Sequence, residues 1–93
     1  MAPRPRWRAV AGYGVHHPDP IDIRLGAALR RARLARGLSQ TQLAEAHGVS
    51  YQQVQKYERG KNRVSVSTLF RLAAALGVSP AQLVAEVEGE SDG

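Results

Sequence analysis

The 93-residue sequence has no cysteine, few aromatic residues and no long apolar run. The lack of cysteine excludes disulfides, thiolate zinc sites, iron–sulfur clusters and cysteine nucleophiles, and it fits a reducing cytosol. No apolar stretch approaches the roughly 20 residues that cross a bilayer, so no membrane contact is expected. A chain of this length makes one domain with a modest core, which is too small for an enzyme with separate cofactor and substrate domains.

Positive charge is in excess, and it is distributed unevenly. The formal net charge is +5, but residues 24–63 carry nine lysines and arginines against Glu45 and Glu58, a net of +7. The last eight residues reverse the sign with four acidic side chains. An excess of this size indicates an anionic partner without identifying it.

The composition divides the chain into three segments. Residues 1–20 hold four of the five prolines and three arginines without an apolar repeat, which predicts a flexible basic arm. Residues 21–87 show helical periodicity and are predicted to form the folded domain. Residues 88–93 are acidic and glycine-containing, which predicts a disordered tail.

Serine caps and glycine stops predict five short helices, no strand and therefore an all-α fold. The first three helices are predicted at about 22–36, 40–47 and 51–58. A fourth follows Ser65 and ends at Gly77, and a fifth follows Ser79 with Pro80 at its first position. Three serines each stand three residues before a glutamine, which predicts capping boxes at Ser39, Ser50 and Ser79.

The stretch QTQLAEAHGVSYQQVQKYE, residues 40–58, predicts two helices joined by a tight turn. A small residue, Ala44, falls where the two helices would meet, and Gly48 can take the left-handed conformation that reverses the chain. Four side chains are expected to face inward: Leu43, Val49, Val54 and Tyr57. This spacing predicts a helix-turn-helix.

The run from Leu25 to Leu83 resembles the Cro and phage-repressor type of helix-turn-helix regulator, also called the xenobiotic-response-element family. The matching elements are Leu29-Arg30, Arg33, Gly37-Leu38-Ser39-Gln40, Leu43-Ala44, Gly48-Val49-Ser50, Tyr57-Glu58-Arg59-Gly60 and Ala75-Leu76-Gly77-Val78-Ser79. The resemblance covers about 60 of the 93 residues. It implies a compact five-helix, repressor-like domain of a bacterial, cytoplasmic transcriptional regulator that binds double-stranded DNA with its third helix in the major groove. Because one such helix reads only a few base pairs, a homodimer on a near-palindromic operator is expected.

Side chains on the outward arc of the 51–58 helix are predicted to contact base edges: Tyr51, Gln52, Gln55 and Lys56. Glutamine can form a bidentate pair with adenine, and lysine can donate to guanine. The alternative is a solvated polar face with good helix propensity. For Tyr51, contact with a thymine methyl, contact with a phosphate and packing on Gln55 all stay open.

Phosphate contacts are predicted at two helix N-termini and in the basic loop that follows the 51–58 helix. The residues concerned are Gln40, Ser50, Gln53, Arg59, Lys61, Asn62 and Arg63. The resemblance implies the same role for Gln40. An ordinary charged loop is the alternative for residues 59–63, although three cations without an acid are poorly explained by solubility alone.

Two further expectations concern structure and assembly. The resemblance implies a partly buried ion pair between Arg33 and Glu58 that links the first and third helices. The last helix carries more apolar side chains than a five-helix monomer obviously needs, so Leu83, Val84 and Val87 are expected to form the dimer surface.

No catalytic, cofactor or metal site is predicted. His16, His17 and Asp19 are close in sequence, but adjacent side chains on an extended arm point apart and no fourth ligand has suitable spacing. No phosphate-cradling glycine loop and no nucleophile motif is present. The sequence therefore does not indicate an enzyme.

Two alternatives stay open. The same fold could serve as an antitoxin or adaptor that binds a protein, not identified by the sequence, through the acidic tail or the arm. In the arm, Trp7 lies between Arg6 and Arg8. These charges are either incidental or belong to an arm that follows a DNA duplex into its minor groove.

Overall fold

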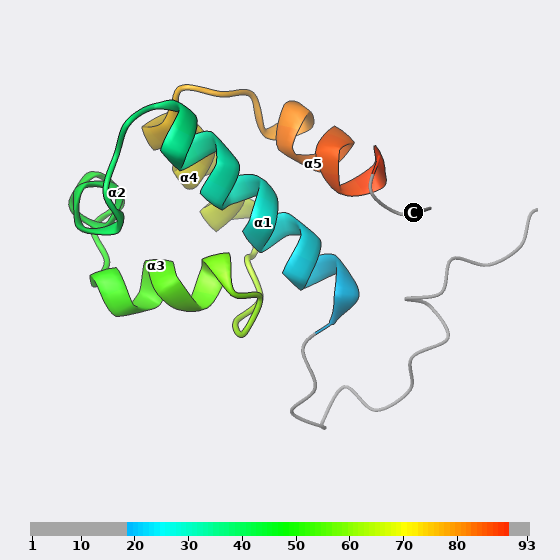
Figure 1. Cartoon of the computed structure of the whole chain (residues 1–93), viewed down its shortest axis with the longest axis horizontal. Helices are drawn as coiled ribbons and strands as arrows, with labels where there is room; N and C mark the ends of the chain where they lie inside the picture. The colour runs from blue at the N-terminus through cyan, green and yellow to red at the C-terminus, as the bar shows by residue number, and fades with distance from the viewer. Residues whose placement is uncertain (1–18, 90–93) are drawn as a thin grey trace, which may run out of the picture.

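The computed structural model describes residues 19–89, and these residues form five α-helices and no strand (Figure 1). The helices are α1 (Pro20–Ala35), α2 (Gln40–His47), α3 (Tyr51–Glu58), α4 (Val66–Leu76) and α5 (Pro80–Gly89). The all-α fold class is therefore confirmed. Residues 1–18, most of the predicted arm, lie outside the described residues, as do residues 90–93 of the predicted tail.

Side-chain caps set where the helices begin. Asp19 accepts a hydrogen bond from the Ile21 N–H at 2.8 Å, so α1 begins at Pro20, two residues before the predicted start. Proline is well suited to this first position because its missing N–H would have no helical partner. Ser39 and Gln42 form the predicted reciprocal box, with the two hydrogen bonds at 3.0 and 2.8 Å.

The other two predicted boxes are only half formed. Ser50 accepts from the Gln53 N–H at 3.2 Å, and Ser79 accepts from the Ala81 and Gln82 N–H groups at 3.1 and 3.4 Å. Within residues 19–89, the hydrogen bonds include no return bond from either glutamine side chain to its capping serine. The serines therefore cap these helices alone, and the prediction of full boxes was wrong there.

Every helix contributes to a single apolar core. Its buried members are Leu25, Ala28, Leu29, Leu43, Ala44, Val54, Leu69, Leu72, Ala73, Leu76, Leu83 and Val87. Leu83 and Val87 face inward because α5 packs along α1, and Leu83 is 0% exposed. The expectation that Leu83, Val84 and Val87 form a dimer surface was therefore wrong, since only Val84 is exposed.

Helices α4 and α5 are the most apolar part of the described chain. Within residues 19–89, no single helix has the length and hydropathy to cross a bilayer. By length and composition alone α4 and α5 reach that threshold together, but they are bent by 106° at their junction. Leu69, Leu72 and Leu83 of this pair lie in the core.

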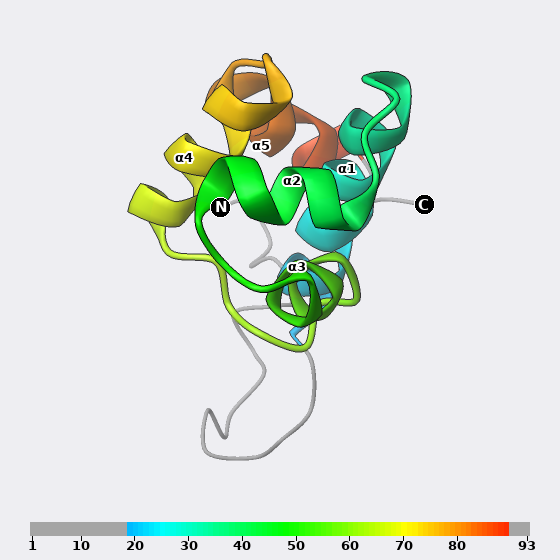
Figure 2. The same ribbon diagram turned by 90° about the vertical axis from the view of Figure 1, so that its left-hand side faces the viewer.

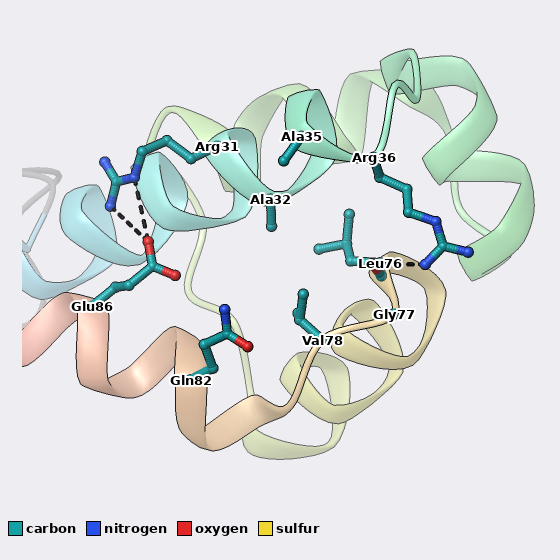
Figure 3. A pocket seen from close by; sticks show the side chains of 9 residues that line it. All are labelled: Arg31, Ala32, Ala35, Arg36, Leu76, Gly77, Val78, Gln82 and Glu86. Atoms are coloured by element: carbon teal, nitrogen blue, oxygen red, sulfur yellow. Dashed lines mark hydrogen bonds and ion pairs between the residues drawn. The ribbon is translucent and has the colours of Figure 1, made fainter.

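Polar side chains fasten α5 and the α4–α5 turn to α1 around a cleft of about 370 Å³ (Figure 3). Arg31 donates to Glu86 at 3.3 Å across the cleft, and Arg36 donates to the Leu76 carbonyl at 3.1 Å. Gly77 has φ +70°, and a Cβ there would meet the Arg36 guanidinium. These two interactions hold α1 against α5 and against the end of α4.

Candidate nucleic-acid interface

The turn between α2 and α3 has the predicted geometry. Gly48 takes the left-handed conformation with φ +85°. Its N–H and that of Val49 both donate to the Ala44 carbonyl, at 2.8 and 3.1 Å. Figure 2 shows α2 running across the view while α3 is seen nearly end-on, as expected when a three-residue turn joins them. Leu43 and Val54, one from each helix, are buried at the crossing.

A buried ion pair holds the end of α3 against α1. The Arg33 Nε atom donates to Glu58 Oε2 at 2.6 Å, and Nη2 donates to Oε1 at 3.0 Å. The two side chains are only 8% and 3% exposed. This arrangement agrees with the structural role that the sequence resemblance implied for the pair.

Two further hydrogen bonds join this pair to the start of α2. Arg33 Nη1 donates to the Leu38 carbonyl at 2.7 Å, and the Gln40 amide donates to Glu58 Oε1 at 3.1 Å. The side chain of Gln40 is therefore engaged by α3, which the sequence did not predict. Because a primary amide carries two N–H groups, a phosphate contact by this side chain would use the second one.

The outward face of α3 is polar and accessible. Tyr51, Gln52 and Lys56 are exposed, whereas Gln55 and Gln53 are half-buried. On the opposite side, Val54 and Glu58 are buried and fix the rotation of the helix about its axis. The predicted base-contacting set thus lies on one accessible arc, with Gln55 at its edge.

The basic loop after α3 lies against the first turn of α1. Arg59, Lys61 and Arg63 are exposed and Asn62 is half-buried. Gly60 has φ +72°, and a Cβ there would meet the backbone of Ile23. Local sequence patterns do not predict this contact, because Gly60 and Ile23 are far apart in the chain.

One cation of the loop has an acidic neighbour. Arg63 Nε lies 3.8 Å from Asp22 Oδ2, so the interpretation of residues 59–63 as cations without an acid needs correction. Burial, together with the negative charge of Asp19, raises the pKa of Asp22, and Arg63 offsets part of this shift. The carboxylate that accompanies the loop comes from α1, where a reading of the loop sequence alone would miss it.

Gly26 is a residue that the sequence reasoning missed. It is buried in α1, and a Cβ there would meet the carbonyl oxygens of Tyr57 and Glu58 at the end of α3. The available signal was a glycine inside a strongly helical pattern, which usually has a packing reason. The close approach of α1 and α3 at this point allows the Arg33–Glu58 pair to form beside it.

His47 ends α2 next to the turn. Its Nδ1 atom is buried without a hydrogen-bond partner. Burial, and then the positive charge of Arg71, lowers the pKa of His47 below its ordinary value.

Among residues 19–89, no group of three or more histidine, aspartate or glutamate side chains is placed to hold a metal ion. His16 and His17 lie outside the described residues.

Comparison with protein families agrees with this geometry. Residues 29–83 match the helix-turn-helix family. A protein named as an uncharacterized helix-turn-helix-type transcriptional regulator from Sinorhizobium medicae is 40% identical over 76 residues, which are 82% of this chain and 55% of that protein. The chain thus spans about half the length of this relative.

Two solved structures are similar to the chain. The clp gene regulator ClgR from Corynebacterium glutamicum has a TM-score of 0.72 and 39% identity, covering 74% of this chain and 90% of that chain. The restriction-modification controller protein C.AhdI from Aeromonas hydrophila has a TM-score of 0.63 and 39% identity, covering 66% of this chain and 92% of that chain.

Proposed function

The chain belongs to the helix-turn-helix family of the Cro and phage-repressor type, and from this premise we propose that it is a sequence-specific, DNA-binding transcriptional regulator. Its relatives are named as regulators, and the chain is not an enzyme. We propose that it acts in the bacterial cytoplasm and, in line with the resemblance to phage repressors, by repression.

The observation that carries the proposal is the rigid presentation of the polar face of α3. Buried Glu58 is hydrogen-bonded to both Arg33 and Gln40, so α3 is fixed relative to α1 and α2 while Gln52 and Lys56 stay accessible. A major groove admits one helix, and its donor and acceptor pattern can be read by glutamine and lysine. We assign base contacts to Tyr51, Gln52, Gln55 and Lys56.

Phosphate contacts would set the register of α3 in the groove. Helix N-termini offer unpaired backbone N–H groups to anions, and α2 and α3 begin at Gln40 and Tyr51. The exposed cations of the loop lie next to the end of α3 and can follow the sugar–phosphate backbone. The proposed phosphate-contacting residues are Gln40, Ser50, Gln53, Arg59, Lys61, Asn62 and Arg63.

A homodimer is the second part of the proposal. One α3 reads only a few base pairs, so two copies about 34 Å apart on a near-palindromic operator would supply the required discrimination. With Leu83 and Val87 of α5 buried in the core, the surface best suited to self-association is on α4. Val66 and Phe70, four residues apart on one face, are 72% and 58% exposed.

Charge supports a second copy as the occupant of this α4 face. Arg71 is the only charged residue in α4. In a two-fold symmetric dimer the α4 face of one chain contacts the same face of the other chain. A neutral apolar face therefore associates without like-charge repulsion. Val66 begins α4 just after the basic loop and the capping residue Ser65. A dimer through this face would therefore bring the basic loops of the two chains together near the centre of the operator.

Selection from a library of random DNA duplexes with the purified protein tests the proposal. We expect enrichment of one sequence with two inverted half-sites about one helical turn apart, bound by two chains. Weak, salt-sensitive binding without enrichment would contradict the proposal. It would instead favour a protein-interaction module of the antitoxin or adaptor type.

A further inference from the structure

We propose that the outward face of α1 is a docking surface for an acidic amphipathic helix of another protein. This α1 face consists of Ile23, Ala27, Arg30 and Leu34, which follow one another along the helix. The inference goes beyond the proposed function, because it concerns a protein partner and uses none of the residues assigned to DNA contacts.

Helical spacing places the four residues in one row. They stand at positions i, i+4, i+7 and i+11 of α1, so their side chains leave the helix on the same side. Ile23 is 46% exposed and Leu34 is 51% exposed, and Arg30 is exposed as well. The core residues of α1 lie on the opposite side: Leu25, Ala28 and Leu29. At 1.5 Å per residue, the row is about 16 Å long.

None of the other four helices described by the structure covers the α1 face. Figure 1 shows α1 in front of α4, with α3 and α5 on either side. On one flank, Gly26 lies against the end of α3, where a Cβ would meet the Glu58 carbonyl. On the other flank, Arg31 donates to Glu86 of α5 at 3.3 Å. The α1 face lies between these two flanks and is open to a partner.

The α1 face is also separate from the proposed DNA-binding face. Glu58 turns toward α1 through its hydrogen bond with Arg33, so the exposed Gln52 and Lys56 lie on the side of α3 away from α1. A chain with α3 in the major groove would therefore keep its α1 face accessible.

The charge around the α1 face is positive and poorly balanced. Arg30 lies in the row, and Arg24 and Arg31 are seven residues apart on the flank toward α5. Arg31 pairs with Glu86, whereas within residues 19–89 the side chains of Arg24 and Arg30 have no ion pair and no hydrogen bond. Asp22, the only acidic residue of α1, lies beside Arg63 instead. Carboxylates on a partner would supply the missing negative charge.

The apolar part of the α1 face fits a helix. Helices pack by placing side chains of one between side chains of the other. Because Ala27 is small, a large aliphatic side chain of a partner can lie between Ile23 and Leu34. A partner helix with aliphatic residues every three or four positions and acidic residues beside them therefore matches both the shape and the charge.

Two other occupants fit less well. In a two-fold symmetric dimer the same arginines of two chains would face each other and repel. A helix that lies on a membrane uses a wide apolar face, whereas the wide apolar face of α1 is in the core. We therefore assign the α1 face to an acidic helix of a different protein.

Selection from a displayed library of random peptides tests the inference, with the purified full-length protein as bait. Peptides of about 15 residues are used because such a helix is longer than the row. We expect enrichment of sequences with aliphatic residues at helical spacing and with aspartate or glutamate beside them. Enrichment of no peptide, or of peptides without this pattern, would overturn the inference. The assay contains no DNA, so this failure would leave the proposed function standing.

Matched variants locate the binding surface. Leu34→Gln and Arg30→Glu should each weaken binding of an enriched peptide about tenfold or more, as measured by fluorescence anisotropy. The controls are Val84→Gln, at an exposed aliphatic residue of α5, and Arg71→Glu, which changes the net charge by the same amount as Arg30→Glu. Equal weakening by Arg30→Glu and Arg71→Glu would overturn the inference, because net charge alone would then attract the peptide.

The remaining occupants have outcomes of their own. Loss of self-association in Leu34→Gln would assign the α1 face to a second copy. Binding of the wild-type protein to phosphatidylglycerol vesicles that is lost in Leu34→Gln would assign it to a membrane. Displacement of the peptide by the selected duplex would assign it to DNA. Each of these results would overturn the inference, whereas a complex that contains protein, duplex and peptide together would support it.

Discussion

The Arg33 guanidinium and the Glu58 carboxylate form a two-point ion pair, with Nε–Oε2 and Nη2–Oε1 distances of 2.6 and 3.0 Å. The two residues are 25 positions apart in the chain. Because Arg33 also bonds the Leu38 carbonyl and Glu58 also accepts from Gln40, the pair connects three helices. The orientation of α3, the helix proposed to read DNA, therefore depends on two buried side chains that lie away from its exposed face.

Removing one partner of this pair should be strongly destabilising. In Glu58→Ala the buried Arg33 guanidinium loses its counter-charge and the Gln40 amide loses its acceptor. Such changes cost about 3 to 5 kcal/mol. Urea unfolding followed by circular dichroism measures the effect. The matched control is Glu45→Ala, an exposed glutamate on α2, which should change the free energy of unfolding by less than about 0.5 kcal/mol. Equal effects would show that the buried pair contributes no more than a surface charge.

Gly26→Ala should destabilise the fold, although helix propensity alone predicts the opposite sign. Alanine is favoured over glycine within a helix by about 0.5 to 1 kcal/mol. At Gly26, however, the added methyl group would meet the Tyr57 and Glu58 carbonyl oxygens, which belong to backbone and cannot easily move. Gly89→Ala is the control, because a Cβ there has no neighbour within 4 Å. Thermal unfolding should show a lower Tm for the first variant and an equal or higher Tm for the second; a raised Tm in both would refute the close approach.

Phe70→Glu should convert the proposed homodimer into a monomer. The substitution places two carboxylates near each other across the two-fold axis and removes an exposed aromatic side chain from the α4 face. Sedimentation equilibrium of the free protein measures the association constant. Leu34→Glu is the matched control because Leu34 is an exposed leucine on α1 rather than α4. Unchanged association in Phe70→Glu, or loss of association in both variants, would place the dimer surface elsewhere.

Lys61→Ala tests the phosphate-binding loop. Loss of one phosphate contact should weaken binding to all duplexes alike and lower the slope of log K against log salt by about one unit. Lys61→Arg keeps the charge and should restore the slope. The measurement is a salt titration of the affinity on the selected duplex and on an unrelated one. A change of base preference in Lys61→Ala would show that this side chain contacts bases instead.

Local sequence signals predicted most of the fold. Serines and glycines at helix ends located α2, α3 and α4 to the residue, because caps and left-handed glycines act within a few positions of the chain. The turn at Gly48 and the burial of Leu43 and Val54 followed from the same local rules. The Arg33–Glu58 ion pair, in contrast, was predicted from the resemblance to a family and not from local sequence signals.

Contacts between distant segments could not be predicted from local patterns. The apolar stripe of α5 suggested a dimer surface, but packing on α1 buries Leu83 and Val87 within one copy. The Asp22–Arg63 approach and the Gln40–Glu58 hydrogen bond likewise depend on how helices pack. The base and phosphate contacts are proposals that the accessibility of α3 and of its loop supports.

Replacement of Gln52, at the exposed start of α3, tests the central claim most directly. The random-duplex selection is repeated with Gln52→Ala and with Gln82→Ala, a glutamine on α5 beside the cleft between α1 and α5. If α3 reads bases, Gln52→Ala should lose about 1 to 3 kcal/mol of binding free energy on the wild-type duplex and relax the preference at one position of each half-site. Gln82→Ala should enrich the wild-type sequence. An unchanged affinity and an unchanged enriched sequence for Gln52→Ala would contradict the assignment of base recognition to this face of α3.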